Sequence, residues 1–296
     1  MAVIETQALT KRYGSARGIE DVTFSVQAGE VFGFLGPNGA GKTTTIRTLL
    51  DLLHPTSGSA RLFGLDSHRD SVAIRARLGN LPGDFGYGKG ASGREAVGLL
   101  ARLRGIERLG RAEQLAERFH ADLDRPLGEL SRGNRQKVGL ILAAFHSPEL
   151  LILDEPTSGL DPLMQEEFLA LVAEERERGC TVLLSSHELD EVERVCDRVG
   201  IVREGKLIAV ERIHELLGRA LRTVTLELED GEALGDLEKL PGVSDLQALD
   251  GKVSFRVAGD LDPVVKAIAR HRVHDMELTH PTLEEVFLGY YGGEGG

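Results

Sequence analysis

"GPNGAGKTT", residues 36–44, follows the apolar run VFGFLG and leads into the helical run TTIRTLLDLL, and this arrangement decides the fold. The nine residues fit the pattern G-x-x-x-x-G-K-[ST], in which a glycine-rich loop joins a strand to a helix. Glycines let backbone N–H groups converge on phosphate oxygens, and the dipole of the following helix adds partial positive charge. The stretch predicts a phosphate-binding loop in an α/β protein. The alternative is a glycine-rich strand-to-helix turn without a ligand.

The residues of this loop have distinct expected tasks. Lys42 reaches the β- and γ-phosphates, Thr43 binds Mg²⁺, and Thr44 adds a hydroxyl near the α-phosphate. The pattern therefore predicts Mg²⁺ and a ligand with β- and γ-phosphates, which the family resemblance described below implies is ATP. The expected cofactor-binding residues of the loop are Gly36, Pro37, Asn38, Gly39, Ala40, Gly41, Lys42, Thr43 and Thr44.

Two carboxylates end the apolar run LLILDEP, residues 150–156. We expect Asp154 to hold Mg²⁺ and Glu155 to accept a proton from an attacking water, although the pattern alone is also a plain strand-to-loop stop. His187 follows the next apolar run, TVLLSS. The C-terminal ends of parallel strands gather ligand groups, so we expect His187 to contact the γ-phosphate. The predicted catalytic residues are Glu155, His187 and Lys42.

The order of strand and helix patterns predicts two domains. Strand patterns fill residues 2–36 and alternate with helical patterns after residue 150, which favours a mixed sheet with an antiparallel N-terminal part. About residues 81–145 are helical in pattern and are interpreted as an insertion into a first domain of residues 1–217. Residues 218–296 predict a small α+β domain in the order strand, helix, strand, strand, helix, strand, which is the order of a ferredoxin-like unit. A last helix, TLEEVFLGYY, and a glycine-rich end follow.

Composition and charge exclude several classes of protein. The chain has 296 residues, 41% of them hydrophobic, and can bury one large core and a smaller second one. A net charge of −12 disfavours nucleic-acid binding through a basic face. The longest apolar run, VGLILAAF, is too short to span a bilayer, so no membrane span is expected. Cys180 and Cys196 lack metal-ligand spacing and are expected to be buried thiols in a reducing cytosol.

The stretch LSRGNRQKVGLILAAF, residues 130–145, predicts a helix whose start has the wrong charge. Its first two turns carry Arg132, Arg135 and Lys137, whereas a helix N-terminus behaves as roughly half a positive charge. Each cation held there costs about 0.3–1 kcal/mol unless an anion lies nearby. The sequence therefore raises the question of which anion this helix start binds.

Five motifs follow one another along the chain in this order: GPNGAGKTT, LSRGNRQ, LLILDEP, SGLD and SSHE. Because of these motifs, residues 3 to about 215 resemble the ATP-binding cassette of ABC transporters, which has a P-loop NTPase fold. The resemblance implies that Tyr13 stacks on adenine. It also implies that two cassettes pair head to tail, so that Ser131 and the backbone of Arg132 and Gly133 donate to ATP held by the partner. Asp161 would line the same interface. The cations of the helix start would then become favourable only in the closed pair. The alternative for Arg135 and Lys137 individually is an ordinary solvated helix face.

Two departures from the family pattern matter. Relatives usually show two glycines and a glutamine where this chain has Arg132, Gly133 and Asn134, so we expect a weakened or retuned closure with backbone donors intact. The glutamine or glutamate that usually links Mg²⁺ to the membrane partner is replaced by Gly83. Asp84 is adjacent and is the candidate substitute for that side chain.

The tail, through HPTLEEVFLGYY, is similar to the C-terminal extension of ATP-binding subunits that serve bacterial drug and antibiotic exporters with separate type-2 permeases. The resemblance implies a cytoplasmic ATPase, peripheral on the inner face of the membrane, that pairs with a second copy or a homologous cassette and drives a separately encoded permease. The implied cargo is a drug, an antibiotic or another lipophilic compound. The alternative is a soluble ATP-binding regulator or a non-transport ABC ATPase, and no nucleic-acid partner is expected.

Overall fold

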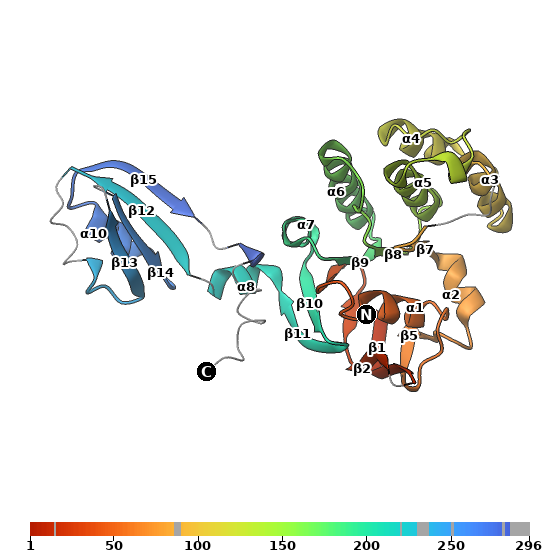
Figure 1. The fold of residues 1–296 in the computed structure, drawn as a ribbon, viewed down its shortest axis with the longest axis horizontal. Helices are drawn as coiled ribbons and strands as arrows, with labels where there is room; N and C mark the ends of the chain where they lie inside the picture. Colours follow the sequence, from red (N-terminus) through yellow and green to blue (C-terminus); the bar gives the residue numbers. More distant parts are fainter. Residues whose placement is uncertain are drawn as a thin grey trace. The chain divides into compact units, whose positions relative to one another are not determined.

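The computed structural model describes residues 1–14, 16–85, 90–219, 221–229, 237–249, 252–279 and 282–284. The chain forms two compact units, Met1–Glu211 and Arg212–Gly296, and Figure 1 colours them along the sequence. This division falls before the boundary expected after residue 217, because helix α8 (Ile213–Arg219) belongs to the second unit.

A six-stranded sheet forms the centre of the first unit, in the order β11-β10-β4-β9-β8-β7. Neighbours from β10 to β7 are paired in parallel. Every residue of β4, β8 and β9 is buried, which explains why these strands appear as unbroken apolar runs in the sequence. The strands are β4 (Val31–Leu35), β7 (Leu78–Leu81), β8 (Leu150–Asp154), β9 (Thr181–Ser186), β10 (Arg198–Arg203) and β11 (Lys206–Arg212).

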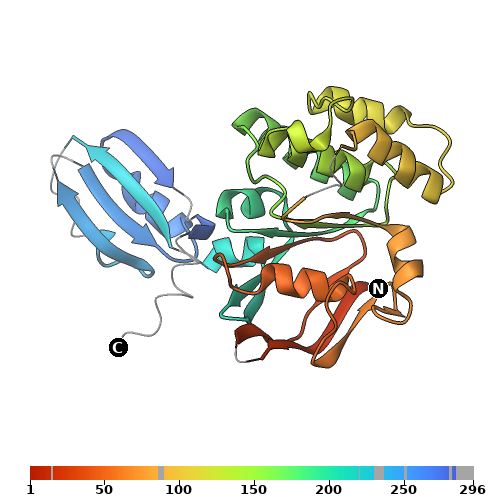
Figure 2. The same ribbon diagram turned by 45° about the vertical axis from the view of Figure 1, so that its right-hand side comes forward.

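A second sheet of the first unit is antiparallel and contains the N-terminal strands. Helix α1 (Lys42–Leu49) lies between the two sheets, as Figure 2 shows, and one buried apolar cluster joins all three. Phe24 stacks in this core on Phe32, with ring centroids 5.4 Å apart. The strands of the second sheet are β1 (Ala2–Tyr13), β2 (Ala16–Val22), β3 (Ser25–Gln27), β5 (Ser57–Leu62) and β6 (Leu65–Asp66).

The expected helical segment after residue 81 contains three α-helices, which Figure 1 shows grouped together. Their starts follow the usual capping chemistry: Ser92 and Glu95 form a reciprocal capping box at α3, and Ser131 caps α5. The helices of the first unit are α1, α2 (Ser71–Arg77), α3 (Gly93–Leu103), α4 (Gly110–Arg118), η1 (Leu127–Glu129), α5 (Arg132–Ala144), α6 (Pro162–Glu177) and α7 (Leu189–Val195). The predicted α/β fold with an antiparallel N-terminal part and a helical insertion is confirmed.

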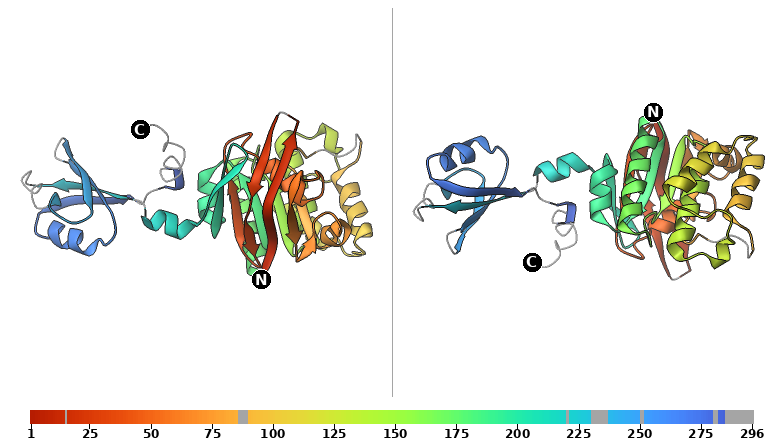
Figure 3. Two further views of the ribbon diagram at one scale, coloured as in Figure 1. Left: turned by 90° about the horizontal axis from the view of Figure 1, so that it is seen from below. Right: turned by 90° about the horizontal axis from the view of Figure 1, so that it is seen from above.

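The second unit contains a four-stranded antiparallel sheet in the order β13-β14-β12-β15. Helix α10 covers one face of this sheet (Figure 3), and Val264 of that helix is buried with Val224 and Phe255 of the strands. This strand order is that of a ferredoxin-like sheet. The helices expected at residues 232–240 and 282–291, and the glycine-rich end, fall mostly or wholly outside the described residues. The elements are β12 (Arg222–Leu228), β13 (Val243–Leu249), β14 (Lys252–Val257), α10 (Asp262–Ile268) and β15 (Val273–Thr279).

Both cysteines lie in the interior of the first unit. Cys180 and Cys196 are buried free thiols, as expected, and burial raises the pKa of Cys180 to about 12. Within the described ranges, no helix combines the length and the apolar character that a bilayer crossing requires.

Candidate nucleotide-binding and catalytic site

The phosphate loop connects β4 to α1, and its glycines are required by two different constraints. Gly39 and Gly41 have φ values of +81° and +113°, which side chains disfavour. Gly36 is required by a close approach, because a Cβ there would lie 2.4 Å from the carbonyl oxygen of Val202. The loop is therefore held in its curved form by the backbone itself. Its outer residues, Pro37, Asn38 and Gly39, are exposed, Ala40 is buried, and Thr43 and Thr44 are half-buried.

Lys42, Glu155 and His187 come together beside this loop, at the C-terminal ends of β4, β8 and β9. The Nζ atom of Lys42 lies 3.1 Å from Oε1 of Glu155 and donates to the carbonyl oxygen of Gly36 at 2.5 Å. The other carboxylate oxygen of Glu155, Oε2, lies 2.5 Å from Nδ1 of His187. Lys42 is only 5% exposed, whereas the His187 side chain is 45% exposed. The three predicted catalytic residues thus form one connected group that solvent reaches from the histidine side.

Asp154 and Glu155 are positioned by Ser185 of the neighbouring strand β9. The hydroxyl of Ser185 donates to Oδ1 of Asp154 at 2.5 Å, and the Glu155 N–H donates to the backbone carbonyl and to the hydroxyl of Ser185 at 3.1 Å each. Glu155 has a φ of +51°, a left-handed conformation that costs of order 1–3 kcal/mol for a residue with a side chain. Sequence reasoning missed Ser185, although a polar residue at the end of an apolar strand is a usable signal.

Gln136 of α5 holds the backbone around the same carboxylate. Its Nε2 atom donates to the carbonyl oxygens of Glu155 and Pro156 at 2.9 Å each. The residue is 5% exposed, so water cannot readily replace these hydrogen bonds. Helix α5, which carries the LSRGNRQ motif, is therefore connected directly to the catalytic strand end. Gln136 is part of the LSRGNRQ motif, but the sequence pattern predicts no role for its side chain.

The three cations at the start of α5 have partners within their own chain. An Nη atom of Arg132 donates to the Ser158 hydroxyl at 2.7 Å, and Arg135 donates to the carbonyl oxygen of Leu130 at 2.8 Å. Lys137 lies 4.0 Å from a carboxylate oxygen of Asp161. Two of the three acceptors are uncharged oxygens, so the expectation that these cations become favourable beside ATP of another chain stays a prediction.

Ser131, Gly133 and Asp161 each have a role in the local structure. The Ser131 hydroxyl accepts from the N–H of Asn134 at 3.3 Å and caps α5. A Cβ at Gly133 would lie 2.3 Å from a carbonyl oxygen of the loop before α6, so only glycine permits this approach. Asp161 caps α6 by accepting from the N–H of Met164 at 3.1 Å, and its side chain remains 59% exposed. Ser131, Gly133 and Asp161 all belong to the first unit. That they contact ATP bound to another chain stays a prediction.

Tyr13 ends strand β1 at the tip of the β1–β2 hairpin, where it is paired with residue 16. Its ring is 41% exposed and lies 5.6 Å from the Nζ atom of Lys11. The second strand of the hairpin approaches the phosphate loop, since a Cβ at Gly41 would lie 2.8 Å from a methyl group of Ile19. The hairpin therefore presents an accessible aromatic ring near the loop, as a residue that stacks on adenine requires.

Gly83 lies directly against the carboxylate of Asp154. A Cβ at this position would lie 3.0 Å from Oδ2 and 3.2 Å from Cγ of Asp154, so the backbone itself occupies the space next to the predicted metal ligand. Asp84 is exposed. The segment around Gly83 also borders an open, mainly apolar cavity of 790 Å³ between α2, β7, α3 and α5, whose lining includes Val72, Leu78, Pro82, Phe85 and Leu103.

The sequence profile described as "ABC transporter" matches residues 19–158, which include the phosphate loop, the α5 motif and both strand-end carboxylates. The chain is 33% identical to the bacitracin transport ATP-binding protein BcrA of Bacillus licheniformis over 98% of each chain. The chain belongs to the ATP-binding subunits of ABC transporters. It is an ATPase subunit whose cassette binds and hydrolyses ATP.

Other ABC ATP-binding proteins are similar over nearly the same length. The daunorubicin/doxorubicin resistance ATP-binding protein DrrA of Streptomyces peucetius is 32% identical, over 98% of this chain and 92% of the relative. A solved structure of an ATP-binding subunit of an ABC transporter has a TM-score of 0.67 and 30% identity, over 72% of this chain and 91% of that one. The dimeric post-hydrolysis form of an ATP-binding cassette has a TM-score of 0.65 at 20% identity, over 71% and 98% of the two chains, and shares the fold.

Proposed function

We propose that this ABC subunit powers the export of an amphiphilic compound, such as a drug, an antibiotic or another lipophilic molecule, through a separately encoded permease at the inner face of the membrane. The observation that carries the ATPase part of the proposal is the connected group of Lys42, Glu155 and His187 beside the phosphate loop. The full-length relatives named for bacitracin and daunorubicin support the cargo class.

Each residue of the group has a chemical task during hydrolysis. Glu155 takes a proton from the water that attacks the γ-phosphate, and His187 hydrogen-bonds the transferred phosphoryl group. Lys42 neutralises charge on the β- and γ-phosphates. Because Lys42 and His187 both contact the Glu155 carboxylate, the arriving γ-phosphate competes for these two partners and leaves the carboxylate free to act as a base.

The residues around Asp154 fit a magnesium ion. Asp154 is 2% exposed, and one of its oxygens is occupied by the Ser185 hydroxyl while the other faces Gly83. With the hydroxyl of Thr43 this is an all-oxygen donor set, which Mg²⁺ prefers. A bound Mg²⁺ would supply charge neutralisation on the β- and γ-phosphate oxygens. Thr43 and Asp154 would hold it.

Pairing of two cassettes would complete each site. The cap residue Ser131 and the backbone of Arg132 and Gly133 are the donors that would face ATP on the partner, a second copy or a homologous cassette. The Asp161 side chain is 59% exposed although one of its oxygens lies 4.0 Å from Lys137, so this carboxylate can line the same interface. The start of α5 is therefore the surface through which we expect one chain to sense the other's nucleotide.

The apolar cavity beside α2 and α3 suits a short amphipathic helix of the permease. Its walls are rigid, because the guanidinium of Arg104 donates to the backbone carbonyls of Arg75, Ala76 and Leu78 at 3.0–3.2 Å. Pro82 and Phe85 line it, and Gly83 between them touches Asp154. A helix seated in this cavity would thus act on the predicted metal ligand through the backbone of Gly83.

Glu155→Gln tests the assigned base. The variant should keep ATP affinity but lose turnover by about 10²–10⁴-fold, since the phosphate loop and Lys42 are intact. Glu117→Gln, an exposed change on α4, is the matched control. Near-normal hydrolysis by Glu155→Gln would remove this residue from its role. Two experiments test the transport part of the proposal: co-purification with the product of an adjacent permease gene, and drug uptake into inverted membrane vesicles. A chain that never associates with a permease would instead be a regulator.

A mixed dimer tests contact across chains. Lys42→Ala damages the phosphate loop, and Ser131→Arg blocks the α5 start with a bulky cation, so each homodimer should fail to trap ATP. If Ser131 serves the partner's ATP, a mixed dimer of the two variants has both lesions in one site and keeps the other intact. We expect about one trapped ATP per differently tagged dimer, because only one site then has both an intact phosphate loop and an intact helix start to bind the phosphate. A formed mixed dimer that traps none would contradict the proposal.

A further inference from the structure

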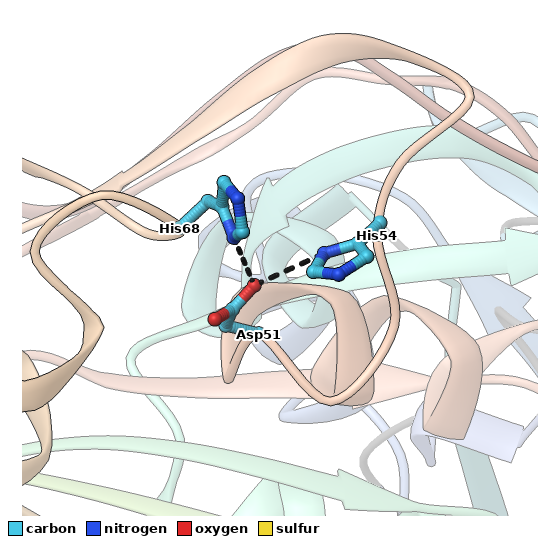
Figure 4. A group of neighbouring side chains, drawn as sticks. All are labelled: Asp51, His54 and His68. Carbon is cyan, nitrogen blue, oxygen red and sulfur yellow. Dashed lines mark hydrogen bonds and ion pairs between the residues drawn. The ribbon is translucent and has the colours of Figure 1, made fainter.

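Asp51, His54 and His68 converge on the surface of the first unit, beyond the end of α1 (Figure 4). The Oδ1 atom of Asp51 lies 2.7 Å from Nδ1 of His68 and 3.2 Å from Nδ1 of His54. One ligand atom from each of the three residues lies within 4.8 Å of the other two. Asp51 and His54 lie three residues apart in the connection between α1 and β5, and His68 lies between β6 and α2.

The centre of this cluster is held in place by the fold. The Asp51 side chain is 13% exposed, and its backbone adopts a left-handed φ of +56° that points it away from the helix. The N–H of His68 donates to the side chain of Asp66 at 3.0 Å, which fixes the segment that carries the imidazole. The two imidazole rings lie edge to face with centroids 4.6 Å apart. The histidine side chains are 68% and 63% exposed, so an ion can enter from solvent.

We propose that Asp51, His54 and His68 form a binding site for a divalent transition metal ion of the zinc class. Two imidazole nitrogens and one carboxylate oxygen are a common three-ligand set for Zn²⁺, with water completing the tetrahedron. Imidazole suits zinc and its neighbours, whereas Mg²⁺ prefers oxygen ligands only, so the ion is of a different class from that at the nucleotide. Adjacent ligand atoms in a tetrahedral zinc site lie roughly 3.3 Å apart, close to the distances from Asp51 Oδ1 to the two imidazoles.

The guanidinium of Arg75 faces the cluster but does not contact the proposed ligand atom of Asp51. Arg75, on α2, lies 3.9 Å from Oδ2 of Asp51 and donates to the carbonyl oxygen of Leu50 at 2.9 Å. The guanidinium therefore neighbours one carboxylate oxygen, while Oδ1 is directed at the two imidazoles. Arg75 weakens the attraction for an ion through its charge but also fixes the orientation of the carboxylate.

The position of the cluster indicates what a bound ion would do. Helix α1 begins at the phosphate loop and rises about 1.5 Å per residue, so Asp51 lies on the order of 13 Å from Lys42, at the opposite end of the helix. The metal would join the end of α1 to the segments that flank β5 and α2. It would therefore act as a structural clamp on the helix that carries the phosphate loop, separate from the catalytic group.

Zinc titration of the full chain, stripped of metal and free of nucleotide, tests this proposal. Calorimetry should detect one Zn²⁺ per chain, and at 100 times the dissociation constant the unfolding temperature should rise by roughly 5–10 °C. Co²⁺ in the same site should give the intense visible absorption of tetrahedral coordination. His54→Ala and His68→Ala should each weaken binding by at least about tenfold, because each removes a direct ligand.

His274→Ala, an exposed histidine on β15 of the second unit, is the matched control and should bind zinc as the unmodified chain does. Both ligand histidines are exposed, so their alanine variants should fold, which circular dichroism checks. Absence of stoichiometric zinc binding by the unmodified chain would overturn the proposal. Equal affinity in His54→Ala, His68→Ala and the control would also overturn it, because the zinc would then be bound elsewhere.

Discussion

Gln136→Met removes the amide that holds the backbone beside the proposed general base. Gln136 donates to the carbonyl oxygens of Glu155 and Pro156 at 2.9 Å each, in a site where the side chain is buried. Methionine has a similar length but no N–H, so both carbonyls lose their donor. A buried polar group without a partner costs about 1–3 kcal/mol, and two cost roughly 2–6 kcal/mol. One kcal/mol shifts Tm by about 2–4 °C in a unit of this size, so Tm should fall by roughly 4–24 °C.

Differential scanning calorimetry measures this change, with the transition of the first unit recognised by its upward shift on adding ATP. Gln114→Met is the control, because that glutamine is exposed on α4. Turnover should also fall for Gln136→Met, since the backbone that carries Glu155 is no longer held relative to Lys42. A variant that melts at the temperature of the unmodified protein and keeps its turnover would refute the reasoning that α5 positions the catalytic carboxylate.

Four further outcomes are expected. Gly133→Ala should reduce ATP-driven pairing in light scattering, because its Cβ would lie 2.3 Å from a neighbouring carbonyl oxygen. With a permease present, Gly83→Ala should impair stimulated ATPase more than ATP affinity, and Asp84→Ala should have the smaller effect; the reverse order would favour the Asp84 carboxylate. Burial lowers the pKa of His146 from 6.5 to about 4, so as the pH falls the imidazole takes up a proton in the unfolded chain before it does so in the folded chain. Stability should therefore fall from pH 6.5 to pH 4, by at most about 3 kcal/mol in urea unfolding, and less in His146→Gln. A chain that ends at residue 211 should still bind a fluorescent ATP analogue, and an unfolded product would contradict the domain boundary.

The phosphate loop and the strand-end residues were predictable because their positions follow from chain order alone. Once LLILDEP and TVLLSS are recognised as parallel strands, their C-terminal ends must meet at one edge of the sheet. Glu155 and His187 are 32 residues apart in the sequence and are hydrogen-bonded in the structure. The glycines of the loop were predictable for a similar reason, since the backbone conformation that they permit is local.

Contacts that depend on side-chain reach and on the docking of separate segments were not predictable. Gln136 is an ordinary polar residue in the sequence, and only the docking of α5 brings it to the backbone of Glu155. Ser185 stands at the end of an apolar run, which marks its position but not its hydrogen bonds to Asp154 and Glu155. Arg132 was expected to await an external anion, but a hydroxyl of the loop before α6 lies within its reach. The cluster of Asp51 with two histidines depends on two connections meeting, because His68 lies 17 residues from Asp51 in the sequence.

The contacts between α5 and the loop before α6 have a consequence for the two ATP molecules of a paired transporter. Arg132 is bonded to Ser158, and Gln136 is bonded to the backbone of Glu155, so the start of α5, which we propose faces the partner's ATP, is connected to the proposed base of its own chain. Whatever free energy one site transmits to the other is returned in equal amount, because linkage between two binding equilibria is reciprocal. If pairing favours both nucleotides, occupancy should rise more steeply with ATP concentration than a hyperbola, and neither nucleotide should be bound independently of the other.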